Sequence, residues 1–319
     1  MTGMWSGVGM KMSKSLIGWR LHMESGKYSS STIEGYMDAI GRIIDFLGDP
    51  DAGDVAVWDL EGYLVHLRDA GVSEATRQYY WKVIKSYFSW ASKRKGLGIE
   101  RPDAELEMPA VPEPEIQPYT LAEIKRLLKA CDKTAEAETD KRESWRYARP
   151  TADRDKLLIL MLLDTGLRVS ELCRIQMKDI NLENQSILVR PFETGKKSRS
   201  RTVFLGVETM DHLWKIAAEE SDPESYLFVS SQSKRIPLNR NAVDHLLKRL
   251  GKKAGVKNCG AHRFRHTFAV QYLRNGGDIF TLKRLIGHRS FYMVQRYLQL
   301  SDADAKTAHR KASPVDNWI

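Results

Sequence analysis

The sequence predicts a mainly α-helical protein with a small antiparallel β-sheet, divided into two domains. Apolar residues recur at helical spacing in both halves of the 319-residue chain. Two short runs rich in β-branched residues lie close together in the second half and supply the sheet. A stretch with four prolines in eleven residues, 108–118, is typical of an extended linker. We therefore expect one domain over 1–107 and another over 119–319.

Three helices are expected before the linker. The first lies within 29–48, begins at serines that can cap it and continues with apolar residues at helical spacing. The second, 57–71, ends at a glycine, and the third, 73–96, opens with Ser73 and Glu74. The aromatic residues of these helices are expected in the core rather than as a platform for nucleic-acid bases. The first half is therefore a small helical domain.

The second half begins with a capping box, in which Thr120 and Glu123 start a helix over 120–131. The polar stretch 133–154 is expected to be a loop or a frayed helix. By contrast, 155–166 is apolar on all sides and predicts a buried helix.

The β-branched runs 184–192 and 200–206 flank the basic segment 193–199. This arrangement predicts a hairpin with a basic turn. Further helices are expected over 239–254, 262–275 and 278–286.

Positive charge is concentrated in the second half. The net charge is +9, yet residues 1–117 carry 13 basic against 17 acidic residues, and 118–319 carry 37 against 24. Within 234–265, ten basic residues accompany one acid, Asp244. This distribution indicates a polyanionic partner, the alternative being a solvated basic face.

Other signals narrow the class of protein. No apolar run reaches the roughly 18 to 20 residues of a membrane span, and the first residues lack the apolar core of a signal peptide. The three cysteines lie too far apart for a zinc site or a disulfide framework: Cys131, Cys173 and Cys259. We therefore expect a cytoplasmic protein in a reducing compartment.

Four short stretches carry candidate catalytic residues: "DTGLRVSEL", "TGKKSRSR", "AHRFRHTFA" and "GHRSFYMVQRY". Each alone has an ordinary explanation, such as a surface ion pair, a solvated lysine or a structural histidine. His262 and His266 have the i, i+4 spacing of metal ligands, but the glutamate of the HExxH pattern is missing. Read together, the stretches supply Arg168, Lys196, His262, Arg265, His288 and Tyr297.

This set of residue types suits attack on a phosphodiester, which moves negative charge onto the phosphoryl and leaving oxygens. Two guanidinium groups can hold those oxygens because arginine is planar, bidentate and always charged. A lysine can protonate the leaving oxygen, and histidines can take or orient the proton of the nucleophile. A tyrosine can form the covalent bond.

The same residues resemble the active-site pattern of the tyrosine recombinase (phage integrase) family, over about 14–305 of the chain. The spacing in that family from the last histidine to the nucleophile selects Tyr297, whereas Tyr292 falls at a position that the family does not use. Glu171 resembles the acidic residue that supports the first arginine. His266 resembles the second, non-catalytic histidine behind the site.

The resemblance implies that Tyr297 attacks a scissile phosphate, forms a 3′-phosphotyrosyl link and releases a 5′-hydroxyl. Arg168 and Arg265 then hold the phosphate. A 5′-hydroxyl of partner DNA reverses the step, so that no ATP, metal or other cofactor is expected.

The remaining roles follow from the same resemblance. Lys196 is the expected general acid, with Lys197 as the alternative within this turn. His262 is expected to assist as a base and His288 as a hydrogen-bond donor.

The family architecture implies a helical core-binding (SAM-like) domain and a catalytic domain that clamp duplex DNA. It also implies a homo-tetramer on synapsed sites, a monomer or weak dimer without DNA, accessory proteins in some cases, and residence with the nucleoid. The length before the first domain suggests a simpler recombinase without an arm-binding domain, either Xer-like or from a transposon or phage. One helix from each domain is expected to meet DNA through Arg77, Lys82, Lys85, Arg240, Lys248, Arg249 and Lys252.

Three other functions stay open on the sequence. They are a non-catalytic DNA-binding relative, a type IB topoisomerase that relaxes DNA without a partner site, and a metal-dependent nuclease.

Overall fold

The chain forms two compact units that join at residue 114 of the sequence, and each is described by itself. The computed structural model describes residues 10–94, 99–112, 116–132, 137–139, 142–145, 151–191, 200–218, 220–230, 233–287, 297, 306, 309–310 and 313–318. No helix among these residues is both long enough and apolar enough to cross a bilayer.

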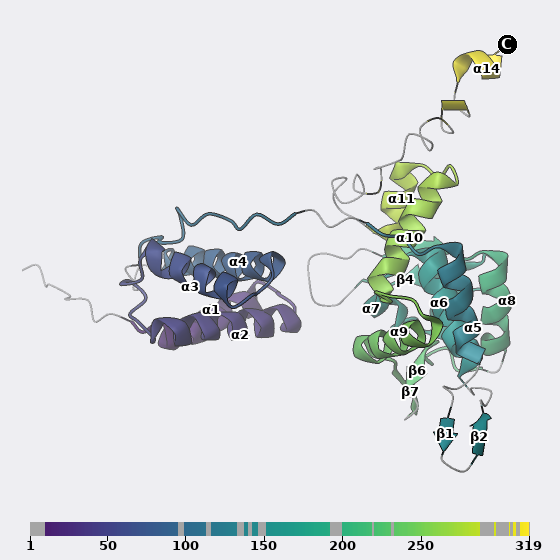
Figure 1. Cartoon of the computed structure of the whole chain (residues 1–319), viewed down its shortest axis with the longest axis horizontal. Coiled ribbons are helices and arrows are strands. Elements are labelled where there is room, and N and C mark those ends of the chain that lie inside the picture. The colour runs from purple at the N-terminus through teal and green to yellow at the C-terminus, as the bar shows by residue number, and fades with distance from the viewer. Residues whose placement is uncertain are drawn as a thin grey trace, which may run out of the picture. The chain divides into compact units, whose positions relative to one another are not determined.

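The N-terminal unit consists of helices in its described part (Figure 1). They are α1 (Met12–Ser25), α2 (Ser30–Leu47), α3 (Val57–Asp69) and α4 (Glu74–Ala91). Ser29 and Ser73 cap α2 and α4, because each side chain accepts a hydrogen bond from a backbone amide of the first turn. The aromatic residues of α4 lie mainly in the core, as predicted, and Tyr87 and Phe88 are fully buried.

Helix α1 has no counterpart among the helices expected from the sequence. Its apolar residues do not follow one stripe, since Met12, Trp19 and Met23 are buried while Ile17 and Leu21 are exposed. Its buried face also includes a serine, whose hydroxyl reaches the Tyr87 hydroxyl at 2.6 Å. Tertiary contacts therefore fix this helix where the hydrophobic pattern does not.

The C-terminal unit contains most of the predicted helices. Its helical elements are α5 (Leu121–Asp132), α6 (Ala152–Thr165), α7 (Val169–Leu172), the short 3₁₀ helix η1 (Met177–Asp179), α8 (Val207–Ala217), α9 (Arg240–Ala254), α10 (Ala261–Arg274), α11 (Ile279–Ile286) and α14 (Pro314–Trp318). The capping box of α5 forms as predicted. The Thr120 amide donates to Glu123 at 2.8 Å and the Glu123 amide to the Thr120 hydroxyl at 3.2 Å.

Short antiparallel strands accompany these helices. They are β1 (Ala137–Thr139) with β2 (Arg142–Trp145), β3 (Ile180–Asn181) with β4 (Ser186–Val189) and β5 (Arg201–Phe204), and β6 (Val229–Ser230) with β7 (Ser233–Pro237). The predicted hairpin is the β4–β5 pair, in which Val189 faces Arg201 and Ile187 faces Val203. The mainly α fold class with small antiparallel sheets is confirmed.

Strands β1 and β2 correct the expectation of a loop or frayed helix over 133–154. Their residues are mostly polar and have low strand propensity, so the sequence pattern does not reveal them. Pairing across the hairpin satisfies their backbone groups instead.

Helix α6 lies at the centre of the C-terminal unit and packs against α5, α8 and α10 (Figure 1). Its apolar residues face neighbours on several sides, and Leu157, Leu158 and Leu162 are fully buried. This confirms the prediction of a buried helix. Because α6 is fixed all round, the turn that follows it has a defined position against α10.

The chain enters this unit along the first two turns of α10. The Tyr119 amide donates to the Thr267 hydroxyl at 2.8 Å, and Arg263 donates to the Gln117 carbonyl at 3.0 Å. Arg263 also pairs with Glu123 at 3.0 Å and stacks 4.0 Å from the centre of the Tyr119 ring. The last residues before α5 are therefore held directly on α10.

Candidate active site

The turn after α6 presents Arg168 at the surface of the C-terminal unit. Helix α6 ends at Thr165 and is capped by Gly166, whose φ of +60° suits glycine. Phe268 of α10 packs so closely on this glycine that an added Cβ would lie 2.4 Å from the ring. Arg168 then opens α7 and keeps 42% of its side chain exposed. The turn therefore offers a guanidinium to a ligand.

Glu171 binds both the backbone and the side chain of Arg168. Its carboxylate accepts from the Arg168 amide at 2.9 Å and from Arg168 Nη1 at 3.1 Å. Arg201 of β5 binds the same carboxylate with two nitrogens, Nη1 at 3.0 Å and Nη2 at 2.8 Å. The predicted support of Arg168 by Glu171 is thus present in the geometry, together with a second arginine.

The pKa of Glu171 reflects these contacts. Burial alone would raise the pKa of this carboxyl group, but hydrogen bonds and charge from Arg201, assisted by the amide and charge of Arg168, outweigh burial. The result is a pKa lowered to about 2. Glu171 is therefore a carboxylate under all physiological conditions.

Arg265 enters the same region from α10 and is almost completely buried, with 1% exposed. Its Nη1 donates to the Gly166 carbonyl at 2.7 Å, and its Nη2 donates to the Ile286 carbonyl at 2.6 Å. Burial and the nearby charge of Arg168 lower its pKa to about 10, so the side chain stays cationic at neutral pH. Arg168 and Arg265 are therefore close enough for their positive charges to interact.

Tyr297 completes the arrangement. The residue is 5% exposed and packs with Ala269, Leu282 and Ile286. Its hydroxyl lies 3.0 Å from His266 Nδ1. The phenol thus lies against α10 and α11, close to the Ile286 carbonyl that Arg265 binds.

The two histidines of α10 differ in their surroundings. The ring of His262 is exposed and lies 4.3 Å, centre to centre, from the ring of His266. His266 is half-buried between His262 and Tyr297. The predicted position of His266 behind the site agrees with this contact.

Contacts through the Gly166 turn and through His266 therefore connect four of the six predicted catalytic residues: Arg168, His262, Arg265 and Tyr297. The other two, Lys196 and His288, lie outside the described residues, as do Lys197 and Tyr292.

Sequence reasoning missed Arg201. Strand β5 alternates, with Val203 and Leu205 buried and Thr202 and Phe204 exposed. Arg201 lies on the same inward face as Val203 and Leu205, and a charged side chain on a buried face needs a charged or polar partner. The alternation of buried and exposed residues along β5 could therefore have indicated that Arg201 has a buried partner.

The residues expected to contact DNA fall into two groups. On α9, Lys248, Arg249 and Lys252 are exposed, and Arg240 is exposed beside Asp244 at 3.6 Å. The exposed side of this helix therefore carries these four basic residues.

On α4 the exposed cation is Lys82, which donates to Gln78 at 3.1 Å. Arg77 is mostly buried and pairs with Glu74 at 3.8 Å. Lys85 donates to the Asp103 and Ala104 carbonyls. Arg77 and Lys85 are therefore engaged inside the N-terminal unit.

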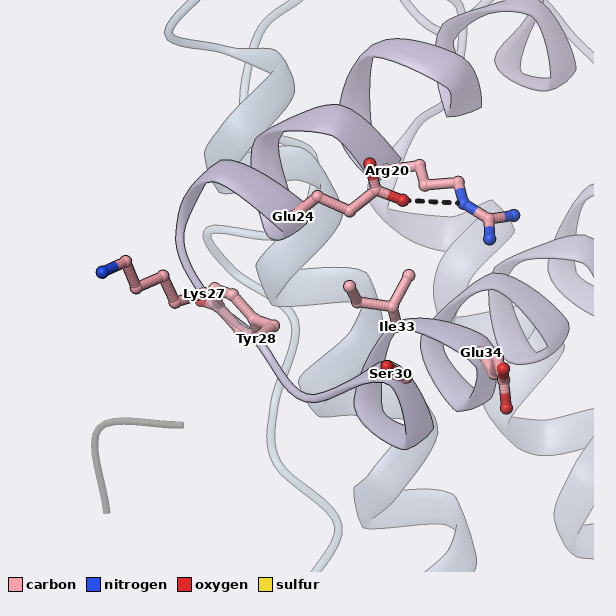
Figure 2. Close-up of a pocket in the computed structure, with 7 residues that line it drawn as sticks. All are labelled: Arg20, Glu24, Lys27, Tyr28, Ser30, Ile33 and Glu34. Carbon is pink, nitrogen blue, oxygen red and sulfur yellow. Dashed lines mark hydrogen bonds and ion pairs between the residues drawn. The ribbon is translucent and has the colours of Figure 1, made fainter. Parts of the chain in front are cut away.

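Figure 2 shows a pocket at the turn between α1 and α2, lined by Arg20, Glu24, Lys27, Tyr28, Ser30, Ile33 and Glu34. Arg20 and Glu24 form an ion pair of 3.1 Å across its wall. None of the predicted catalytic or DNA-contacting residues lines it.

Comparison with known families identifies the family of the chain. Residues 119–304 match the model of the phage integrase family, and residues 16–97 match its N-terminal SAM-like domain. The chain therefore belongs to the phage integrase family and is a tyrosine recombinase. The resemblance inferred from the motifs is confirmed.

Individual relatives cover nearly the whole chain. The tyrosine recombinase XerA of Thermococcus kodakarensis is 30% identical over 292 residues, which is 91% of this chain and 92% of the relative. The tyrosine recombinase XerC of Mycobacterium tuberculosis is 27% identical over 304 residues, or 92% and 96% of the two chains.

Solved structures share the fold. The Tn1549 transposon integrase bound to a circular-intermediate DNA aligns with a TM-score of 0.70 at 20% identity, over 95% of this chain and all of the other. The lambda integrase tetramer on a Holliday junction aligns with a TM-score of 0.67 at 19% identity, over 88% and 78% of the two chains. The predicted tyrosine-recombinase architecture is confirmed.

Proposed function

We propose that this chain is a site-specific DNA recombinase that cuts and rejoins duplex DNA through a bond between Tyr297 and the scissile phosphate. The observation that supports this most strongly is the bond from Arg265 to the Gly166 carbonyl in the turn that carries Arg168, together with the contact of the Tyr297 hydroxyl with His266, the residue next to Arg265. Two guanidinium groups and a phenol in one place suit phosphoryl transfer better than the binding of any neutral ligand.

In the proposed reaction the Tyr297 oxygen forms a bond to phosphorus while the bond to the 5′-oxygen breaks. The departing oxygen gains a proton and leaves as a 5′-hydroxyl, and the 3′ end stays joined to the protein. Attack by a partner 5′-hydroxyl restores the phosphodiester and releases the phenol. Bond energy is conserved, so the cycle needs no nucleotide cofactor.

Each positive group has a defined proposed task. Arg168 and Arg265 neutralise the nonbridging oxygens, whose charge increases in the transition state. One such preorganised donor contributes roughly 2.7–4 kcal/mol in comparable sites. Lys196, with Lys197 as the alternative, protonates the 5′-oxygen.

The histidines serve the proton transfers. We propose His262 as the assisting base and His288 as a hydrogen-bond donor to the phosphate. His266 holds the phenol in the DNA-free chain, as the contact of 3.0 Å supports.

The two units take separate parts in this proposal. Residues 1–107 form the core-binding domain, 108–118 the linker and 119–319 the catalytic domain. The exposed cations of α9 contact phosphates. The lambda integrase tetramer on a Holliday junction supports a homo-tetramer on two synapsed sites. The chain acts in the cytoplasm on nucleoid DNA.

Covalent capture tests the proposal. The full chain is incubated with fragments of the source genome, and the DNA that stays attached after denaturation is sequenced. A duplex with the captured sequence is then made with a nick just downstream of the scissile phosphate. After cleavage the short end diffuses away, so the DNA stays joined to the protein. This molecule serves as a suicide duplex. We expect adduct formation in EDTA, which distinguishes this chemistry from that of a metal-dependent nuclease.

Two tyrosine variants identify the nucleophile. Tyr297→Phe should bind the suicide duplex and form no adduct, whereas the matched variant Tyr292→Phe should form it normally. An adduct in Tyr297→Phe would contradict the assignment. Absence of any adduct with the wild-type chain would favour the non-catalytic alternative, and relaxation of supercoiled DNA without a partner site would favour the topoisomerase.

A further inference from the structure

Arg201 joins three segments that the proposed reaction uses. It lies on the inward face of β5, opposite Val189, and 8% of its side chain is exposed. Its Nη1 and Nη2 bind the Glu171 carboxylate, and its Nε donates to the Leu285 carbonyl at 2.7 Å. Strand β5 follows the segment of the sequence that contains Lys196. One side chain therefore connects the β4–β5 hairpin, the Arg168 turn and the end of α11.

We infer that Arg201 is a positioning residue for DNA cleavage, because it occupies the Glu171 carboxylate and so leaves the guanidinium of Arg168 available to the scissile phosphate. This inference rests on the proposed function.

The contacts of Glu171 show how the carboxylate is shared. Arg201 uses both terminal nitrogens against both oxygens, the paired geometry that makes arginine–carboxylate contacts strong. Arg168 gives Glu171 its amide and one guanidinium nitrogen. Since 42% of the Arg168 side chain stays exposed, Glu171 orients this arginine without covering it.

Removal of Arg201 would change this division. A buried carboxylate without a cation is costly, so Glu171 would attract the remaining guanidinium beside it. Arg168 could then form the two-nitrogen contact with Glu171 itself. Its guanidinium would pair with the protein and would no longer be available to the phosphate. Arg201 thus works by competing with Arg168 for one partner.

A second set of contacts links Arg201 to the segment before His288. Gly287 caps α11 with φ of +67°, and an added Cβ there would lie 3.1 Å from Arg201 Nη1. Arg201 binds the Leu285 carbonyl, and Arg265 binds the adjacent Ile286 carbonyl. The two arginines together fix the last turn of α11 against the Arg168 turn.

The test compares two versions of the suicide duplex. One has the natural phosphodiester at the scissile position, and the other has a methylphosphonate, in which a methyl group replaces one charged oxygen. The neutral linkage has less need of a guanidinium clamp. A defect in Arg168 presentation should therefore affect the natural duplex far more than the neutral one, whereas damage to the fold should affect both equally.

Arg201→Met removes the charge but keeps much of the side-chain volume. We expect this variant to cleave the natural duplex about 100-fold more slowly at saturating DNA, near the low end for the loss of one preorganised donor. Its affinity for the duplex and its cleavage of the methylphosphonate should stay close to wild type. Arg190→Met is the matched control, because Arg190 pairs with Asp179 and does not contact Glu171. This control should cleave both duplexes normally.

The double variant Arg201→Met/Glu171→Gln removes the competing carboxylate charge as well. It should cleave the natural duplex faster than Arg201→Met alone. Arg201→Lys, which keeps the charge but cannot contact both oxygens in parallel, should show an intermediate defect. If melting curves show Arg201→Met to be unfolded, these two variants decide the question by the same comparison of duplexes.

Two results would overturn the inference: equal cleavage of the natural duplex by Arg201→Met and wild type, or equal slowing on both duplexes. A double variant no faster than Arg201→Met would refute the competition for Glu171. Absence of a Tyr297-dependent adduct with the wild-type chain would instead overturn the proposed function, and the inference with it.

Discussion

Replacing Gly166 with alanine tests how the Arg168 turn is held. Two features of this position resist a side chain. The backbone has φ of +60°, a left-handed conformation that costs an alanine roughly 1–2 kcal/mol. The new Cβ would also lie 2.4 Å from Phe268 Cδ1, so the ring or the turn must move. Overpacking of this kind costs about 1–3 kcal/mol.

The chain contains a matched control for the first of these costs. Gly255 at the end of α9 has φ of +63°, and no described atom lies within 4 Å of its Cβ position. Gly255→Ala should therefore destabilise the protein by roughly 1–2 kcal/mol, the conformational cost alone. Gly166→Ala should cost about 2–5 kcal/mol, because the clash is added.

Scanning calorimetry of the full chain measures both variants. For a domain of this size, each kcal/mol lowers Tm by about 2–4 °C. A Phe268→Ala background completes a double-mutant cycle, and without the ring Gly166→Ala should cost no more than Gly255→Ala. Cleavage should also slow in Gly166→Ala, because Arg265 donates to the Gly166 carbonyl. Equal costs for the two glycines in the wild-type background would refute the close packing of Phe268.

Three further outcomes follow from the site and the basic surfaces. Glu171→Gln should lose on the order of 3 kcal/mol of stability at pH 7. Because the native pKa of Glu171 is lowered from 4.5 to about 2, the difference from wild type should shrink in denaturation experiments as pH falls through this window. His266→Leu should slow cleavage about fivefold, the equivalent of one hydrogen bond of about 1 kcal/mol to Tyr297, and His266→Gln should recover part of the rate. Lys252→Ala should reduce the slope of log K for DNA binding against log salt concentration by about 1. Lys85→Ala should lower Tm and leave this slope unchanged, because Lys85 binds carbonyls inside the N-terminal unit. A reduced slope in Lys85→Ala would contradict that internal role.

Much of the fold could be predicted because its signals are local. The caps at Ser29, Ser73 and Thr120 each act on a backbone amide within the next turn, so they are visible in a few consecutive letters. Helix α1 lacked such a signal, since Ile17 is exposed while the polar Ser15 is buried. Its position depends on neighbours distant in sequence.

The same distinction applies to the site. Arg168, Arg265 and Tyr297 lie in short motifs with fixed spacing, and a motif can be recognised without knowledge of its partners. The role of Arg201 depends on Glu171, 30 residues away, and on Leu285, 84 residues away. Likewise, the spacing of Lys85 on its helix cannot show that carbonyls of the 99–106 segment bind its ammonium group.

The bonds from Arg265 to the Gly166 and Ile286 carbonyls have a consequence for the comparison of related sequences. This side chain fastens two loops whether or not DNA is cut, so a descendant that had lost its chemistry would still need it in order to fold. The presence of an arginine at this position is therefore weak evidence that a relative is active. The hydroxyl of Tyr297, by contrast, is the group proposed to attack the phosphate, so its loss would mark an inactive relative more directly.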